Sequence, residues 1–218
     1  MKRIWFFVLL LLTSIGLFRS HAYAVALETQ STSGQLLIEQ ATGLLAGGSG
    51  SIDLPFVNAE KIREAWLSWH NDERTSKWLE KLNYQSDLER TATDRSTSLV
   101  EKYTGHKRPG MSWYYNYNGL KKWFSEREVN FVDTSGAKSL FSESIGYRYY
   151  KCNSWDCTET ALKALRKIFD GYLKEGNNGV HYKAIVMPHF KYIGVGFAVN
   201  SKTKTVYTTI HYGTDILE

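Results

Sequence analysis

Apolar residues recur every three or four positions in three segments of the chain, the spacing that places side chains on one face of a helix. The first predicted helix begins after Asn58, a suitable N-cap. The second begins with a capping box of Ser86 and Glu89 and is expected to end at Gly105. The third follows Cys157. The stripes are Ile62, Ala65, Trp66 and Trp69; Leu88, Ala92, Leu99 and Tyr103; and Ala161, Leu162, Leu165, Ile168, Phe169 and Tyr172.

The later part of the chain is rich in the β-branched and aromatic residues that favour strands. Strands are predicted over residues 141–152, 182–187, 192–199 and 205–212, with Pro188 ending the second of them. Helices therefore come first and strands last, joined by long connections. This order indicates an α+β fold, a three-layer α-β-α sandwich with a central antiparallel sheet.

The first 24 residues have the pattern of a signal peptide. Lys2 and Arg3 precede an apolar run that is shorter than the roughly 20 residues needed to span a bilayer. A small-x-small motif ending at Ala24 predicts cleavage before Val25. Residues 25–57 are expected to form a low-complexity spacer and residues 58–218 the folded domain. The mature protein is then secreted, extracellular or periplasmic, without a membrane span.

The charge of the chain argues against nucleic-acid binding. The formal net charge is +5, but three of the 27 basic residues lie in the leader and none of the 22 acidic residues does. Removing the leader leaves 24 basic residues, a net charge of +2, which is low for a nucleic-acid-binding surface.

The two cysteines, Cys152 and Cys157, enclose four residues. An even cysteine count in an exported chain predicts a disulfide, here a local clip at the start of the following helix. Two thiols are too few for a structural zinc site.

Three polar residues are candidates for one site on an otherwise apolar sandwich: His106, Glu143 and His181. We expect His70, His189 and His211 to be structural. The aromatic run 113–117 has two interpretations, namely packing over the core or a stacking surface for sugar rings and other flat ligands.

Several segments together resemble the CAP superfamily of cysteine-rich secretory proteins, venom antigens and pathogenesis-related proteins. The segment 70–74, His-Asn-Asp-Glu-Arg, resembles the HN-x-x-R helix of that family. Gly105-His106 is similar to its first cavity histidine, residues 141–145 to its GEN-I segment, and residues 179–182 to its GHY motif. The tail at 185–198 also matches, so the resemblance covers roughly residues 58–212 in the family's order.

The resemblance implies an α-β-α sandwich, secretion, and a cleft lined by His106, Glu143 and His181. In some members this cleft binds a divalent metal, which here implies Zn²⁺ or Mg²⁺ held by His106 and His181 with Glu143. The chain departs from the family pattern at Ser142, Ser144 and Val180. A fourth cleft residue has three candidates, which are Asp170, Tyr172 and Glu175.

Three functions remain open. The first is an extracellular binding or interaction module whose partner is a glycan, lipid or protein. The second is a metal-dependent hydrolase of peptides or cell-wall material, in which a metal-bound water would attack, although no nucleophile–base constellation is visible. The third is a glycan- or lipid-binding module that uses residues 113–117.

Overall fold

The computed structural model describes residues 56–111, 116–133 and 136–217. The chain divides into two units, residues 1–53 and 54–218, and every described residue belongs to the second. The predicted signal peptide, most of the spacer and the aromatic residues at 113–115 lie outside the described residues. No helix in the described ranges combines the length and apolarity needed to cross a membrane.

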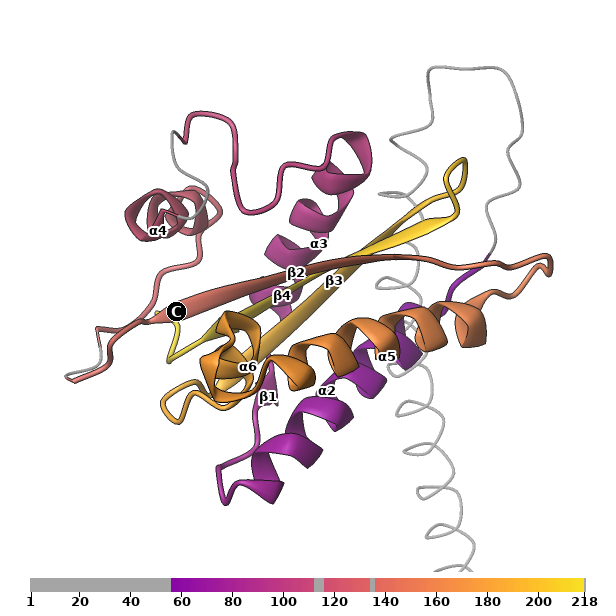
Figure 1. Cartoon of the computed structure of the whole chain (residues 1–218). Coiled ribbons are helices and arrows are strands. Elements are labelled where there is room, and N and C mark those ends of the chain that lie inside the picture. The colour runs from indigo at the N-terminus through magenta and orange to yellow at the C-terminus, as the bar shows by residue number, and fades with distance from the viewer. Residues whose placement is uncertain (1–55, 112–115, 134–135, 218) are drawn as a thin grey trace, which may run out of the picture. The chain divides into compact units, whose positions relative to one another are not determined.

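Figure 1 shows a sheet with helices on both faces. Its strand order is β1-β3-β4-β2. The strands are β1 (Asn83–Tyr84), β2 (Phe141–Tyr149), β3 (Tyr192–Asn200) and β4 (Thr205–Gly213). β4 pairs antiparallel with both β2 and β3, and the short β1 adds to β3 in parallel. The α-β-α sandwich and its mainly antiparallel sheet are therefore confirmed.

One face of the sheet carries α3 (Ser86–Glu101) and α4 (Tyr117–Ser125). Gly194 and Gly196 of β3 allow α3 to lie directly on the sheet, since a Cβ at either position would overlap the α3 backbone near Leu88 and Ala92. An apolar cluster near the start of β2 joins α3 to α4 through Leu88, Leu120, Phe124 and Phe141.

The other face carries α2 (Ala59–Ser76), α5 (Thr158–Glu175), the 3₁₀ turn η1 (Gly176–Asn178) and α6 (Val180–Ile185). The larger core cluster fills the space between these helices and the sheet. Asn58 is the N-cap of α2, as predicted, and its side chain accepts a hydrogen bond from the Lys61 amide at 3.0 Å.

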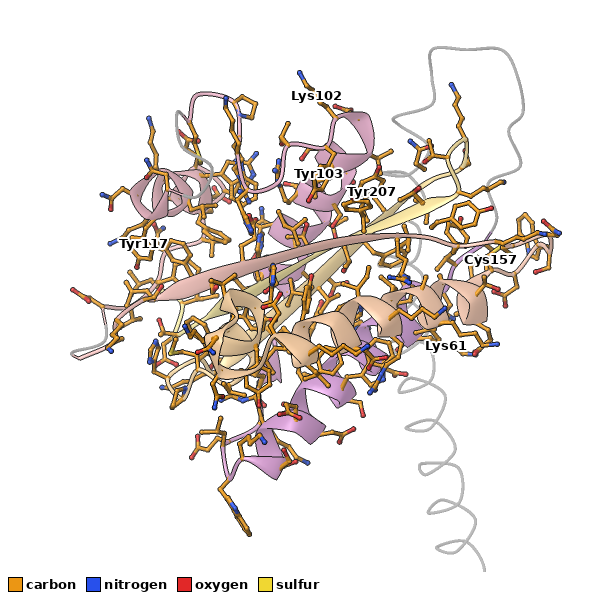
Figure 2. The ribbon with its side chains drawn as sticks, viewed as in Figure 1. Lys61, Lys102, Tyr103, Tyr117, Cys157 and Tyr207 are labelled. Carbon is orange, nitrogen blue, oxygen red and sulfur yellow. A yellow bond between two sulfur atoms is a disulfide. The ribbon has the colours of Figure 1, made fainter. Side chains whose placement is uncertain are left out.

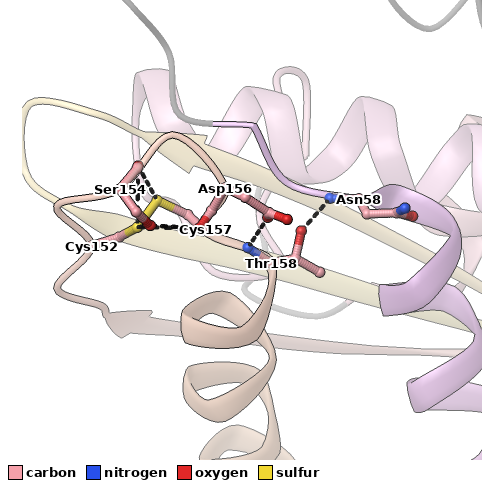
Figure 3. The surroundings of a disulfide bond; sticks show 6 residues. All are labelled: Asn58, Cys152, Ser154, Asp156, Cys157 and Thr158. Carbon is pink, nitrogen blue, oxygen red and sulfur yellow. Dashed lines mark hydrogen bonds between the residues drawn. A yellow bond between two sulfur atoms is a disulfide. The ribbon is translucent and has the colours of Figure 1, made fainter.

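The disulfide between Cys152 and Cys157 is confirmed and precedes α5 directly. Figure 3 shows what it holds in place. Asp156 accepts a hydrogen bond from the Thr158 amide at 2.9 Å, and the Thr158 hydroxyl accepts one from the Asn58 amide at 2.9 Å. The disulfide therefore closes the loop before α5, and the bond between Thr158 and Asn58 ties the start of α5 to the start of α2.

Two elements near the candidate site differ from the sequence prediction. The segment predicted as a strand over residues 182–187 lies largely in the helix α6. The prediction was wrong because the buried residues Tyr182, Ala184 and Ile185 fit a strand as well as a short helix. The second helix ends at Glu101 rather than at Gly105. Gly105 instead occupies a later turn with a positive φ of 56°.

Candidate functional site

Glu143 is the centre of a buried polar cluster on the face of the sheet that α3 and α4 cover. It comes from β2, directly opposite His211 of β4 in the antiparallel register. The loop after α3 supplies His106, whose Nδ1 lies 2.8 Å from Glu143 Oε1. The same loop supplies Arg108, whose two terminal nitrogens donate to the two oxygens of Glu143. The structure therefore brings two of the predicted residues, His106 and Glu143, into contact.

The Glu143 carboxylate is charged and fully surrounded by donors. Its side chain has no exposed surface, and that of Arg108 is 1% exposed. Burial alone would raise the pKa of Glu143, but attraction to Arg108 and hydrogen bonds from His106, His211 and Arg108 outweigh it and hold this pKa well below its usual value. A buried carboxylate is stable in this state because a bidentate arginine compensates its charge.

Arg95 of α3 holds the loop that carries His106 and Arg108 through hydrogen bonds. The Arg95 guanidinium donates to the carbonyls of Gly105 and Lys107 and to the Thr104 hydroxyl. Burial and the nearby charge of Arg108 lower the pKa of Arg95 to about 10. Arg108 also stacks on Trp123 of α4, with its guanidinium carbon 4.2 Å from the ring centroid.

His211 completes the cluster as a neutral ring. Burial lowers its pKa, although its hydrogen bond to Glu143 acts in the opposite direction. Nε2 lies 2.9 Å from Glu143 Oε2, and an ionised carboxylate can only accept, so Nε2 carries the proton. Nδ1 then accepts from the Thr91 hydroxyl at 2.9 Å. The network assigns this tautomer and thereby fixes the ring between α3 and β2.

His181 belongs to a second group, on α5 and α6. Its Nδ1 lies 2.6 Å from Glu175 Oε1, and its ring stacks on Tyr172 with centroids 4.5 Å apart. Glu175 also accepts a hydrogen bond from the His181 amide at 3.0 Å. Among the three candidates for a fourth cleft residue, Glu175 and Tyr172 thus contact His181, whereas Asp170 pairs with Arg166 at 2.8 Å.

The expected metal ligands do not form a three-ligand group. Within the described ranges, no three His, Cys, Asp or Glu side chains are arranged to hold a metal ion. The oxygens of Glu143 are occupied by Arg108 and the two histidines, so this carboxylate has no lone pair directed at an open position. Zinc or magnesium binding through His106 and His181 stays a prediction.

The HN-x-x-R segment of α2 is a structural element on the opposite face of the sheet. Arg74 is fully buried and donates to four backbone carbonyls, those of Glu80, Ile185, Met187 and Phe190. His70 is also fully buried, with Nδ1 2.8 Å from the Trp66 carbonyl and Nε2 2.8 Å from the Tyr212 hydroxyl. Both residues therefore hold α2 against α6 and the sheet.

The burial of His70 predicts a specific loss of stability in acid. Burial, opposed by the hydrogen bond to Trp66 and aided by the charge of Arg74, lowers the pKa of His70 from 6.5 to about 4. The unfolded chain therefore binds more protons between these values. The contribution of neutral His70 to the free energy of unfolding is fully present above pH 6.5 and falls by about 3 kcal/mol by pH 4. Urea unfolding of wild type and His70→Gln at pH 7, 5.5 and 4 should show a smaller acid loss in the variant; parallel profiles would contradict it.

Sequence reasoning missed two members of the Glu143 cluster, Arg108 and His211. Arg108 follows His106 by two residues in the same loop, so a cation near the predicted carboxylate was a usable signal. His211 was interpreted as structural. Its contact with Glu143 follows from the register of β2 on β4, which needs knowledge of the strand pairing.

Comparisons with known proteins bear on the whole domain. The model of the cysteine-rich secretory protein (CAP) family matches residues 67–212. A comparison with curated proteins gave no match. Among solved structures, an outer surface protein of Borrelia burgdorferi has a TM-score of 0.50 at 12% identity and covers 72% of this chain and 96% of its own.

The CAP domain of enterococcal PrgA also has a TM-score of 0.50, at 18% identity over 75% of this chain and 66% of its own. At these identities the two structures indicate a shared fold. The family match spans well over half of the chain and includes every element of the Glu143 cluster. This protein therefore belongs to the cysteine-rich secretory protein (CAP) family.

Proposed function

We propose that this protein is exported and acts outside the cytoplasm as a binding module that does not hydrolyse its ligand. The signal-peptide pattern of residues 1–24 supports export. The disulfide supports it too, because such bonds persist in oxidising compartments. Membership of a secretory protein family agrees with both.

The occupied carboxylate of Glu143 is the observation that supports binding over hydrolysis. A general base must accept a proton from water or substrate, and a metal ligand must direct a lone pair at the ion. Glu143 is buried and already accepts hydrogen bonds from Arg108, His106 and His211. Its depressed pKa makes it a weak base. The cluster is therefore suited to fixing the loop at 104–108 on the sheet.

Zinc titration by calorimetry, paired with assays of peptide and cell-wall hydrolysis, tests this proposal. We expect the same zinc heat for wild type and His106→Ala, and no metal-dependent turnover, because His106 is committed to Glu143. His189→Ala is a matched control for adventitious binding, since His189 contacts the Ser139 carbonyl away from the cluster. Zinc heat or turnover that is lost in His106→Ala and retained in His189→Ala would contradict the proposal.

A further inference from the structure

An aromatic surface lies beyond the end of α3, on the same face of the sheet. Tyr147 of β2 is directly opposite Tyr207 of β4, so both side chains leave the sheet on one face. The helix ends at Glu101, and Tyr103 follows it over these two strands. Figure 2 shows Tyr103 and Tyr207 next to each other at this end of the helix.

The three tyrosines contact one another and remain accessible. The ring of Tyr103 is 4.8 Å from that of Tyr147 and 6.4 Å from that of Tyr207, and the last two are 5.8 Å apart. Tyr103 is 48% exposed and Tyr147 55% exposed. We call this group the tyrosine shelf. A contiguous exposed aromatic surface of this kind is typical of a binding site rather than of core packing.

The chain segments that carry the tyrosine shelf are strongly basic. Residues 101–107, 147–151 and 202–207 contain one exposed carboxylate, Glu101. Their exposed cations are Lys102, Lys107, Arg148, Lys151, Lys202 and Lys204. Arg148 follows Tyr147 in β2 and so points to the other face of the sheet. The five lysines of these segments are therefore the cations that we consider for the shelf. Their excess contrasts with the near balance of charge in the chain without its leader.

We propose that the tyrosine shelf binds an acidic polysaccharide, a chain of uronate-type sugars. The apolar faces of the sugar rings would stack on Tyr103, Tyr147 and Tyr207, and their carboxylates would pair with the surrounding lysines. This inference rests on the proposed binding function and names its ligand class. Membrane insertion fits the shelf less well. Surfaces that enter lipid present aliphatic or tryptophan side chains, whereas the shelf presents tyrosines with polar hydroxyl groups.

The probe for this site is polygalacturonate, with fully methyl-esterified polygalacturonate as its uncharged match. The wild-type protein is expected to bind the acid form more tightly, and more weakly as salt rises. Tyr147→Ala is expected to weaken binding roughly 5- to 10-fold, the effect of one lost stacking partner. Trp78→Ala is the matched control and should leave affinity unchanged, because Trp78 is 96% exposed at the end of α2, outside the shelf.

Circular dichroism and urea unfolding confirm that each variant is folded. Equal affinity of wild type and Tyr147→Ala, equal affinity for the acid and esterified polymers, or no binding would overturn the inference. So would tighter Tyr147-dependent binding to anionic phosphatidylglycerol vesicles or to a single-stranded oligonucleotide. Cleavage of polygalacturonate, measured by released reducing ends, would instead contradict the proposed function, so the two failures are distinguishable.

Discussion

Replacement of Arg74 by methionine is expected to lower the free energy of unfolding by about 4 kcal/mol. The guanidinium donates to the carbonyls of Glu80, Ile185, Met187 and Phe190, at distances from 2.7 to 3.2 Å. Methionine fills a similar volume but donates nothing. The bonds to Ile185 and Phe190 are buried and those to Glu80 and Met187 partly buried. A buried carbonyl without a donor costs about 1 kcal/mol or more, so losing all four donors is a large change.

Urea unfolding at pH 7 measures this effect, and Arg166→Met is the matched control. Arg166 also lies on a helix, but its side chain is 46% exposed and pairs with Asp170 one turn away. Such exposed pairs contribute about 0.5 kcal/mol or less. If both variants lose a similar small amount, the account of Arg74 as the connection between α2 and the 185–190 segment is wrong.

Glu143→Gln is expected to lower the free energy of unfolding by about 3 to 5 kcal/mol, the cost of breaking one side of a buried ion pair. The glutamine amide would place a donor against the donors of Arg108, and the buried guanidinium would lose its counter-charge. The two histidines contact different oxygens of Glu143, so one of them would also lose its acceptor to the glutamine NH2 group.

The pH dependence provides a second readout of Glu143. Because its folded pKa is depressed, the ion pair stabilises the protein above the unfolded pKa of a glutamate, and that stability is lost as pH falls through the folded value. Glu143→Gln should therefore cost most near neutral pH and least in strong acid. Glu126→Gln is the control, since Glu126 is 55% exposed and lies 3.7 Å from Lys122.

Much of the fold could be predicted because its signals are local. Asn58 is a good N-cap followed by an apolar stripe, and Cys152 and Cys157 are close enough in sequence to form a clip. The helix α6 could not be predicted in the same way. A short apolar run satisfies both helix and strand periods, and its packing against α5 decides between them.

The candidate site was less predictable because its geometry depends on contacts between distant segments. The resemblance identified His106 and Glu143, which do meet. The contacts of His181 are Glu175 and Tyr172, on α5, and its place in one cleft with His106 and Glu143 stays a prediction. The position of Arg108, two residues after His106, indicates a cation near the predicted carboxylate. Its pairing with both oxygens of Glu143 depends on how the fold places the loop against β2.

The coupling free energy between Glu143 and Arg108 tests most directly that this carboxylate belongs to a closed ion pair rather than to a reactive centre. A double-mutant cycle of Glu143→Gln, Arg108→Met and the double variant gives this value from urea unfolding at pH 7. We predict a coupling of about 3 kcal/mol or more, with Glu143→Gln nearly neutral once Arg108 is gone. If the losses in unfolding free energy of the two single variants are additive, the two side chains do not form a closed ion pair. Glu143 would then be available as a metal ligand or a general base.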